Sequence, residues 1–137
     1  MPTQTNNVIM PKSDKATLRL RVWIEQENEI YIGIGSTLLL QHIEKLGSLR
    51  KAAEELGMSY RRAWGKLKNA EERIGQPLVE KTKGKGQRFN LSPFGKELME
   101  KFLHFYLDIE EYATAKAAEV LDMKVEKSGE FYRDDTE

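Results

Sequence analysis

The fold of this 137-residue chain is decided by two neighbouring stretches, GSLRKAAEELGMSYRRAWGKL (47–67) and IGQPLVEKTKGKGQRFNLSPFG (74–95). The first stretch predicts a short helix, a tight turn and a second helix. Ser48 and Ser59 are favourable N-caps for these helices. Gly57 lies between the helices, where a sharp turn requires the positive φ that glycine adopts most easily. This order is typical of a helix-turn-helix.

The second stretch predicts a β-hairpin followed by a new helix. A strand begins at Leu78, the chain turns at the glycine-lysine run 83–86, and a second strand returns to Leu91. Ser92 and Pro93 then start a helix, because serine caps it and proline is favoured at its first position. We therefore predict a winged helix-turn-helix, mainly α with small β.

The residues before these stretches predict an N-terminal hairpin and one more helix. Apolar and polar residues alternate over 18–24 and again over 30–34, with a turn at 26–28 between them. Ser36 is the expected N-cap of a helix that ends at Gly47.

We divide the chain into four parts: a disordered tail (1–15), the winged domain (16–95), a dimerisation helix (96–123) and an acidic flexible tail (124–137). The helix is expected to begin at Pro93, and its thirty or so residues make a rod of roughly 45 Å. One winged domain cannot cover so long an apolar stripe.

The composition indicates one domain that folds without a disulfide or thiolate-metal framework. Hydrophobic residues make up 39% of the chain, and there are no cysteines. His42 and His104 fit no metal-binding spacing, so we expect neither metal nor cofactor. No apolar run approaches the roughly 20 residues of a membrane helix, and no signal peptide is visible. We therefore expect no membrane contact and a cytoplasmic location.

The net charge of zero hides an asymmetry. Residues 59–88 carry nine cations against three anions, whereas residues 97–137 carry twelve anions against five cations. A basic block beside an acidic one fits a nucleic-acid-binding surface with an acidic far side. Two ordinary solvated faces would produce the same count, and charge alone does not separate the two interpretations.

The second helix of the pair, expected over 59–74, is the candidate for base recognition. Arginine can donate two hydrogen bonds to guanine, and asparagine can recognise adenine. Gly65 on the outward face either lets the backbone approach DNA closely or is neutral. The alternative is an exposed helix that carries cations for solubility. The DNA-binding candidates of this helix are Ser59, Tyr60, Arg61, Arg62, Lys66 and Asn69.

The hairpin over 81–88 is the candidate wing. Lys83, Lys85 and Arg88 are expected to bind phosphates or to enter the minor groove of double-stranded DNA. The alternative is a solvated loop.

A broad apolar and aromatic stripe along the last helix is expected to pack against the same helix of a second copy. The alternative is a helix that folds back on its own domain. The dimerisation candidates are Leu98, Phe102, Phe105, Ile109, Tyr112 and Val120.

Several of these motifs resemble two families of bacterial regulators. RIG (73–75), LVEK (78–81) and LSPFG (91–95) resemble the DNA-binding domain of LysR-type transcriptional regulators. MSYRRAW (58–64) and the N-terminal hairpin are more similar to the N-terminal domain of ModE, the molybdate-dependent regulator. The resemblance covers roughly residues 18–121. It implies a homodimer that places the helix beginning at Ser59 in the major groove.

The families named above carry further effector-binding domains, and we expect neither such a domain nor a small-molecule effector within this chain. We interpret the chain as a homodimeric transcriptional regulator that reads a pseudo-palindromic site. The alternative is a protein-interaction module that has lost DNA binding. No nucleophile-base pair or catalytic carboxylate pair stands out, so we expect no enzyme.

Overall fold

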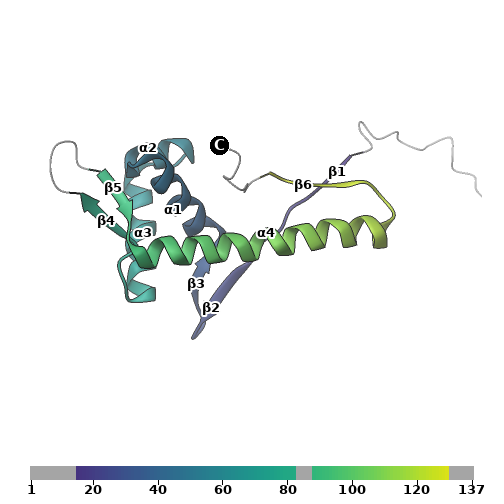
Figure 1. Ribbon diagram of the computed structural model, residues 1–137, viewed down its shortest axis with the longest axis horizontal. Helices are drawn as coiled ribbons and strands as arrows, with labels where there is room; N and C mark the ends of the chain where they lie inside the picture. Colours follow the sequence, from purple (N-terminus) through teal and green to yellow (C-terminus); the bar gives the residue numbers. More distant parts are fainter. Residues whose placement is uncertain (1–14, 83–87, 130–137) are drawn as a thin grey trace, which may run out of the picture.

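The computed structural model describes residues 15–82 and 88–129, and one long helix projects from a smaller helical body (Figure 1). The elements in chain order are β1 (Ala16–Leu18), β2 (Trp23–Gln26), β3 (Glu29–Gly33), α1 (Ile34–Leu46), α2 (Leu49–Glu55), α3 (Tyr60–Ile74), β4 (Val79–Thr82), β5 (Arg88–Leu91), α4 (Pro93–Leu121) and β6 (Val125–Lys127). The strands form two-stranded sheets, so the predicted class, mainly α with small β, is confirmed. Across these two ranges, none of the helices has the length and hydropathy of a membrane span.

Serine side chains begin α2, α3 and α4, as predicted. Backbone N–H groups donate to the three hydroxyls: Lys51 to Ser48 (3.1 Å), Arg62 to Ser59 (3.0 Å) and Gly95 to Ser92 (2.9 Å). Gly47 and Gly75 end α1 and α3 at φ values of 67° and 87°, in the left-handed region that glycine favours. Local residue chemistry therefore sets most helix ends of the winged domain.

The start of α1 differs from the prediction, which placed the N-cap at Ser36. Strand β3 runs directly into the helix, so Gly33 is the N-cap and Ser36 lies inside the first turn. The Ser36 and Thr37 hydroxyls donate to the Gly33 carbonyl at 3.4 and 2.8 Å. The buried side chain of Ile32 holds the strand end in the core and leaves no loop for a cap at Ser36.

The N-terminal hairpin is formed by β2 and β3, which pair antiparallel. Glu27 and Asn28 make its turn at φ values of 53° and 68°, which suits the twist of a two-residue hairpin loop. The turn predicted at 26–28 is therefore confirmed. The strand predicted over 18–24 is interrupted. Residues 19–22 connect β1 to β2 and belong to neither strand, and their side chains Leu20 and Val22 pack against the smaller group of buried residues around Tyr106.

Residues after α4 correct the predicted boundary of the C-terminal tail. Asp122 adopts a left-handed conformation at φ 58° and ends the helix at Leu121, not at residue 123. The chain then turns back, and β6 pairs parallel with β1 alongside the outer half of α4 (Figure 1). Residues 124–129 therefore belong to the folded part. The tail predicted at 1–15 lies outside the described residues except for Lys15, and so do residues 130–137.

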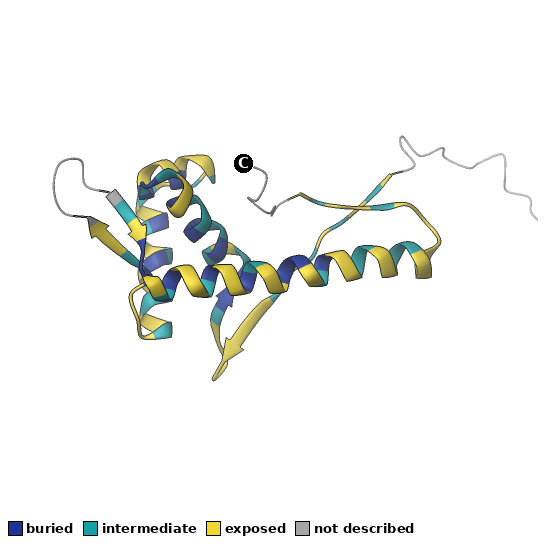
Figure 2. Ribbon diagram, in the orientation of Figure 1, coloured by how far each residue is buried: buried dark blue, intermediate teal, exposed yellow. Residues whose placement is uncertain are grey.

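Two clusters of buried side chains form the core (Figure 2). The larger cluster joins α1, α2 and α3 to the wing strands and the start of α4, and includes Leu39, Ile43 and Leu67. The smaller cluster packs Ile32 of β3 against Tyr106 and neighbouring residues in the middle of α4. Because α4 contributes to both clusters, its first half is held firmly against the winged domain.

Candidate nucleic-acid interface

The turn between α2 and α3 has the geometry that Gly57 predicted. Gly57 lies at φ 68°, and Met58 N–H donates to the Ala53 carbonyl at 3.0 Å. Ala53 and Ala63 are both buried where the two helices cross. Small side chains allow the close approach that fixes the angle of α3.

The outward face of α3 carries side chains with hydrogen-bonding groups directed to solvent. Arg61, Arg62 and Asn69 are all exposed, and Gly65 lies exposed among them. Ser59 is also exposed and caps the helix. The structure thus brings most of the predicted base-recognition residues onto one accessible surface.

Tyr60 has a different position from the other candidates, because its side chain is half-buried against the larger core cluster. The Arg50 guanidinium of α2 lies 4.4 Å above the Tyr60 ring, within cation–π distance. Sequence reasoning missed Arg50, although an arginine near the start of the first helix of the pair is a usable signal. The tyrosine therefore holds an additional cation beside the start of α3.

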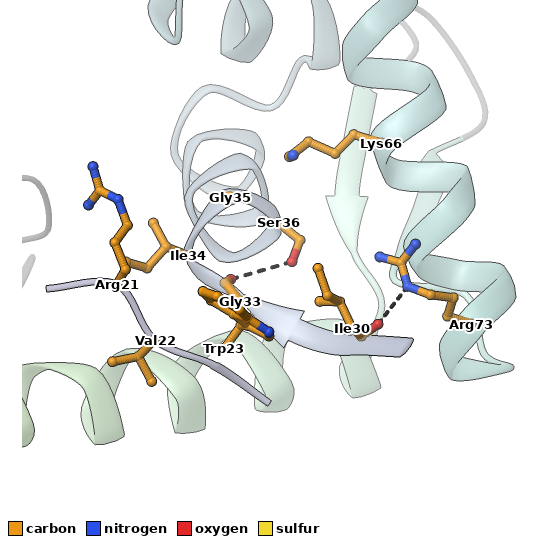
Figure 3. A pocket seen from close by; sticks show the side chains of 10 residues that line it. All are labelled: Arg21, Val22, Trp23, Ile30, Gly33, Ile34, Gly35, Ser36, Lys66 and Arg73. Carbon is orange, nitrogen blue, oxygen red and sulfur yellow. Dashed lines mark hydrogen bonds between the residues drawn. The ribbon is translucent and has the colours of Figure 1, made fainter. Parts of the chain in front are cut away.

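Lys66 also departs from the prediction, which placed it on the outward face of α3. It is half-buried, and its ammonium extends sideways to the first turn of α1 (Figure 3). The Lys66 Cε and Nζ atoms lie only 2.9 and 3.0 Å from where a Cβ on Gly35 would stand. The absence of a side chain at Gly35 thus leaves the space that the ammonium occupies.

The base of the wing is tied to α3 by a carboxylate. Glu71 Oε2 accepts hydrogen bonds from the Leu78 and Val79 N–H groups at 2.7 and 3.4 Å. The following strands pair in register from Val79 with Leu91 to Thr82 with Arg88. These contacts fix the direction in which the hairpin leaves the domain.

A second set of contacts ties the wing to α4. The Ser92 hydroxyl donates to the Pro77 carbonyl at 2.8 Å, and Ser92 N–H donates to the Leu78 carbonyl at 2.9 Å. A Cβ on Gly95 would overlap the Leu78 carbonyl oxygen. Glycine is therefore required where α4 passes under the wing.

The tip of the predicted wing lies outside the described residues, and with it Lys83 and Lys85. Arg88 is placed in the backbone of β5. Lys81 lies on β4, with its ammonium 5.6 Å from the centre of the Phe89 ring, and it is an exposed cation that our list of candidates omitted.

The candidate dimerisation residues differ in burial along α4, and Ile109 among them is half-buried. Phe102 is buried in the smaller core cluster, which corrects its assignment, and Leu98 is half-buried against both clusters. Phe105, Tyr112 and Val120 are exposed to 40%, 67% and 65%. The first half of the stripe packs on the domain because α4 crosses it there, and only the projecting half keeps an exposed apolar side.

Residues 37–96, less than half of the chain, match the family described as bacterial regulatory helix-turn-helix protein, lysR family. No curated protein shows detectable similarity to the sequence. Among solved structures, ArgP from Mycobacterium tuberculosis is 25% identical, with a TM-score of 0.47 over 58% of this chain and 28% of that one. The chain therefore spans less than a third of that relative's length. Its helix-turn-helix and wing are similar to the DNA-binding domain of lysR-family regulators.

Proposed function

We propose that this chain is a DNA-binding transcriptional regulator that acts as a homodimer on a pseudo-palindromic site. The single observation that carries the proposal is the exposed face of α3, with Arg61, Arg62 and Asn69 directed to solvent after the Gly57 turn. A helix of this width fits the major groove, where these side chain types recognise guanine and adenine. The lysR-family match over residues 37–96 supports the same function.

Phosphate contacts position the helix on the DNA. The Ser59 end of α3 and the Arg50 guanidinium, which lies over the Tyr60 ring, suit the phosphates beside the major groove. The wing cations Lys83, Lys85 and Arg88 reach the neighbouring backbone or minor groove in this proposal. Such contacts supply affinity for any sequence, whereas α3 supplies sequence preference.

The second copy binds along the projecting half of α4. Phe105, Ile109 and Tyr112 follow a spacing of four and then three residues, so they share one side of the helix. Val120 continues the same exposed apolar side toward the helix end. Large exposed apolar surfaces on soluble proteins mark interaction sites, and a twofold pair of such helices covers both stripes.

A protein-interaction module with the same fold is the competing function. Fluorescence anisotropy of labelled duplex DNA, titrated with the full chain at several salt concentrations, distinguishes a DNA-binding regulator from an interaction module. We expect log affinity to fall linearly with log salt, because phosphate contacts release counterions. Arg61→Ala combined with Arg62→Ala should weaken binding, whereas the matched control Lys101→Ala on α4 should not. Undetectable binding at low salt would leave the interaction module as the better explanation.

A further inference from the structure

A cavity of about 330 Å³ lies between the β2–β3 hairpin, the first turn of α1 and the flank of α3 (Figure 3). Three cationic residues from separate parts of the chain line it: Arg21, Lys66 and Arg73. No carboxylate of the described residues lines it. A hollow with charges of one sign concentrates ions of the opposite sign.

Two of the three cations, Lys66 and Arg73, lie at the cavity without an acidic partner among the described residues. The Arg73 Nε–H donates to the Ile30 carbonyl at 2.6 Å, and the Lys66 ammonium lies against Gly35. Neither residue forms an ion pair with a carboxylate in the part of the chain that the structure describes. Their positive charges therefore remain available to an external anion.

The remaining walls of the cavity are apolar. Trp23 and Ile30 are 50% and 45% exposed, and they are among the large apolar side chains left open to solvent. Val22 and Ile34 continue the apolar wall. Sites for small molecules combine such walls with a few well-placed polar groups.

We propose that this cavity binds a small organic anion whose carboxylate or phosphate group binds Lys66 and Arg73 and whose apolar body covers Trp23 and Ile30. This inference replaces the expectation from the sequence that no small-molecule effector binds within this chain. The site was not predictable from sequence, because its lining comes from residues 21–36 and from two positions on α3.

The site also implies regulation, and that consequence rests on the proposed function. Lys66 and Arg73 belong to the helix that enters DNA in our proposal, so an anion that neutralises them lowers the positive potential that attracts phosphates to that helix. Coupling between two sites is reciprocal, and typical values change affinity by fivefold or more. The bound anion should therefore lower DNA affinity by about that factor.

The test is an NMR titration of the ¹⁵N-labelled full chain with 1-naphthoate and, separately, octanoate. We expect saturable shifts of the Gly33, Gly35 and Ser36 amides and of the Trp23 indole. Neutral 1-naphthalenemethanol should bind at least tenfold more weakly, since it lacks the charge-assisted hydrogen bonds. Absence of saturable shifts with both anions at millimolar concentration overturns the proposal, and so do shifts centred on Phe105 and Tyr112 of α4.

Two variants locate the binding. Lys66→Met keeps the length of the side chain and should weaken naphthoate binding at least tenfold. The control Lys101→Met removes an exposed charge from α4 and should bind like the wild-type protein. Gly35→Ala leaves the charge unchanged but displaces the Lys66 ammonium, so it should also weaken binding. Equal naphthoate affinity of the two lysine variants would contradict the site.

A parallel titration with duplex DNA separates this inference from the proposed function. Naphthoate binding without DNA binding supports the cavity and rejects the regulator. DNA binding without naphthoate binding supports the regulator and rejects the anion site in the cavity. When both bind, saturating naphthoate should lower DNA affinity, and unchanged DNA affinity would reject the competition.

Discussion

At the scale of single residues, the direction of each side chain on α3 decides its role. Arg61, Arg62 and Asn69 make no side-chain hydrogen bond to any described residue and are exposed. Lys66 extends from the flank of the same helix and lies against Gly35 of α1. The outward residues are therefore suited to base contacts, whereas Lys66 is suited to an anionic group beside the helix.

Arg62→Ala tests base recognition. We expect it to cost about 1–3 kcal/mol on the preferred site and to relax base preference at one position of each half-site. Sequencing of DNA selected by the variant from a randomised pool measures this. An unchanged sequence preference would remove Arg62 from the base-recognition set.

Gly95→Ala tests the contact between α4 and the wing. Its Cβ would overlap the Leu78 carbonyl oxygen, so the backbone must shift, and we expect a loss of about 1–3 kcal/mol in the free energy of unfolding. Gly65→Ala is the matched control, because nothing lies within 4 Å of its Cβ position and alanine favours a helix by about 1 kcal/mol. Urea unfolding of both variants measures the difference, and equal stability would contradict the packing described here.

At the scale of elements, the wing and the helix-turn-helix are held as one unit. Glu71 joins α3 to the start of β4, and the Trp64 ring of α3 meets the Phe89 ring of β5 edge-on at 5.9 Å. Phe89 N–H also donates to the Gly47 carbonyl at 3.2 Å. The wing therefore keeps a fixed direction relative to α3, which a two-point contact with DNA requires.

Replacing Lys83 and Lys85 together by alanine tests the wing. We expect all DNA sequences to bind more weakly by a similar factor, because phosphate contacts carry no base information. The slope of log affinity against log salt should become shallower by about one to two. A slope equal to that of the wild-type protein would show that the hairpin does not reach the backbone.

The helices were predictable because their signals are local. Ser48, Ser59 and Ser92 each cap a helix through a backbone N–H three residues away, so a short stretch of sequence contains the whole interaction. The parallel pairing of β1 with β6 was not predictable, because it joins Ala16 to Val125 through chain ends that look polar and unstructured in sequence.

The candidate site was predictable only in part, for a similar reason. The outward face of α3 follows from helical periodicity within one element. The direction of Lys66 depends on Gly35 in another helix, and the stacking of Arg50 on Tyr60 depends on the angle between α2 and α3. Leu98 and Phe102 share a helical stripe with Phe105, and periodicity does not show which part of a stripe the domain covers.

At the scale of the whole molecule, the first half of α4 packs on the winged domain and its outer half projects as an arm. Strands β1 and β6 lie alongside this arm (Figure 1), and Phe105, Tyr112 and Val120 of the arm are exposed. An arm of this kind sets the distance between two winged domains when it pairs with its copy. Two recognition helices about one DNA turn, or 34–36 Å, apart would then face the same side of the duplex.

Tyr112→Glu tests the assembly. Because Tyr112 is 67% exposed, the change should leave the fold of one chain intact while it places a carboxylate in the dimer contact. We expect light scattering to show a dimer for the wild-type protein and a monomer of about 15.8 kDa for the variant. His104→Glu introduces a carboxylate about 100° around the helix from Phe105 and should stay dimeric. A monomeric wild-type protein would contradict the dimer.

The most direct test of the central claim is the sequence of DNA that the wild-type chain selects from a randomised duplex pool. We expect an inverted repeat whose half-site centres lie about one helical turn apart, since two tethered α3 helices read the two halves. Enrichment of a single half-site would contradict the dimer, and a pool that remains random would contradict DNA recognition by α3.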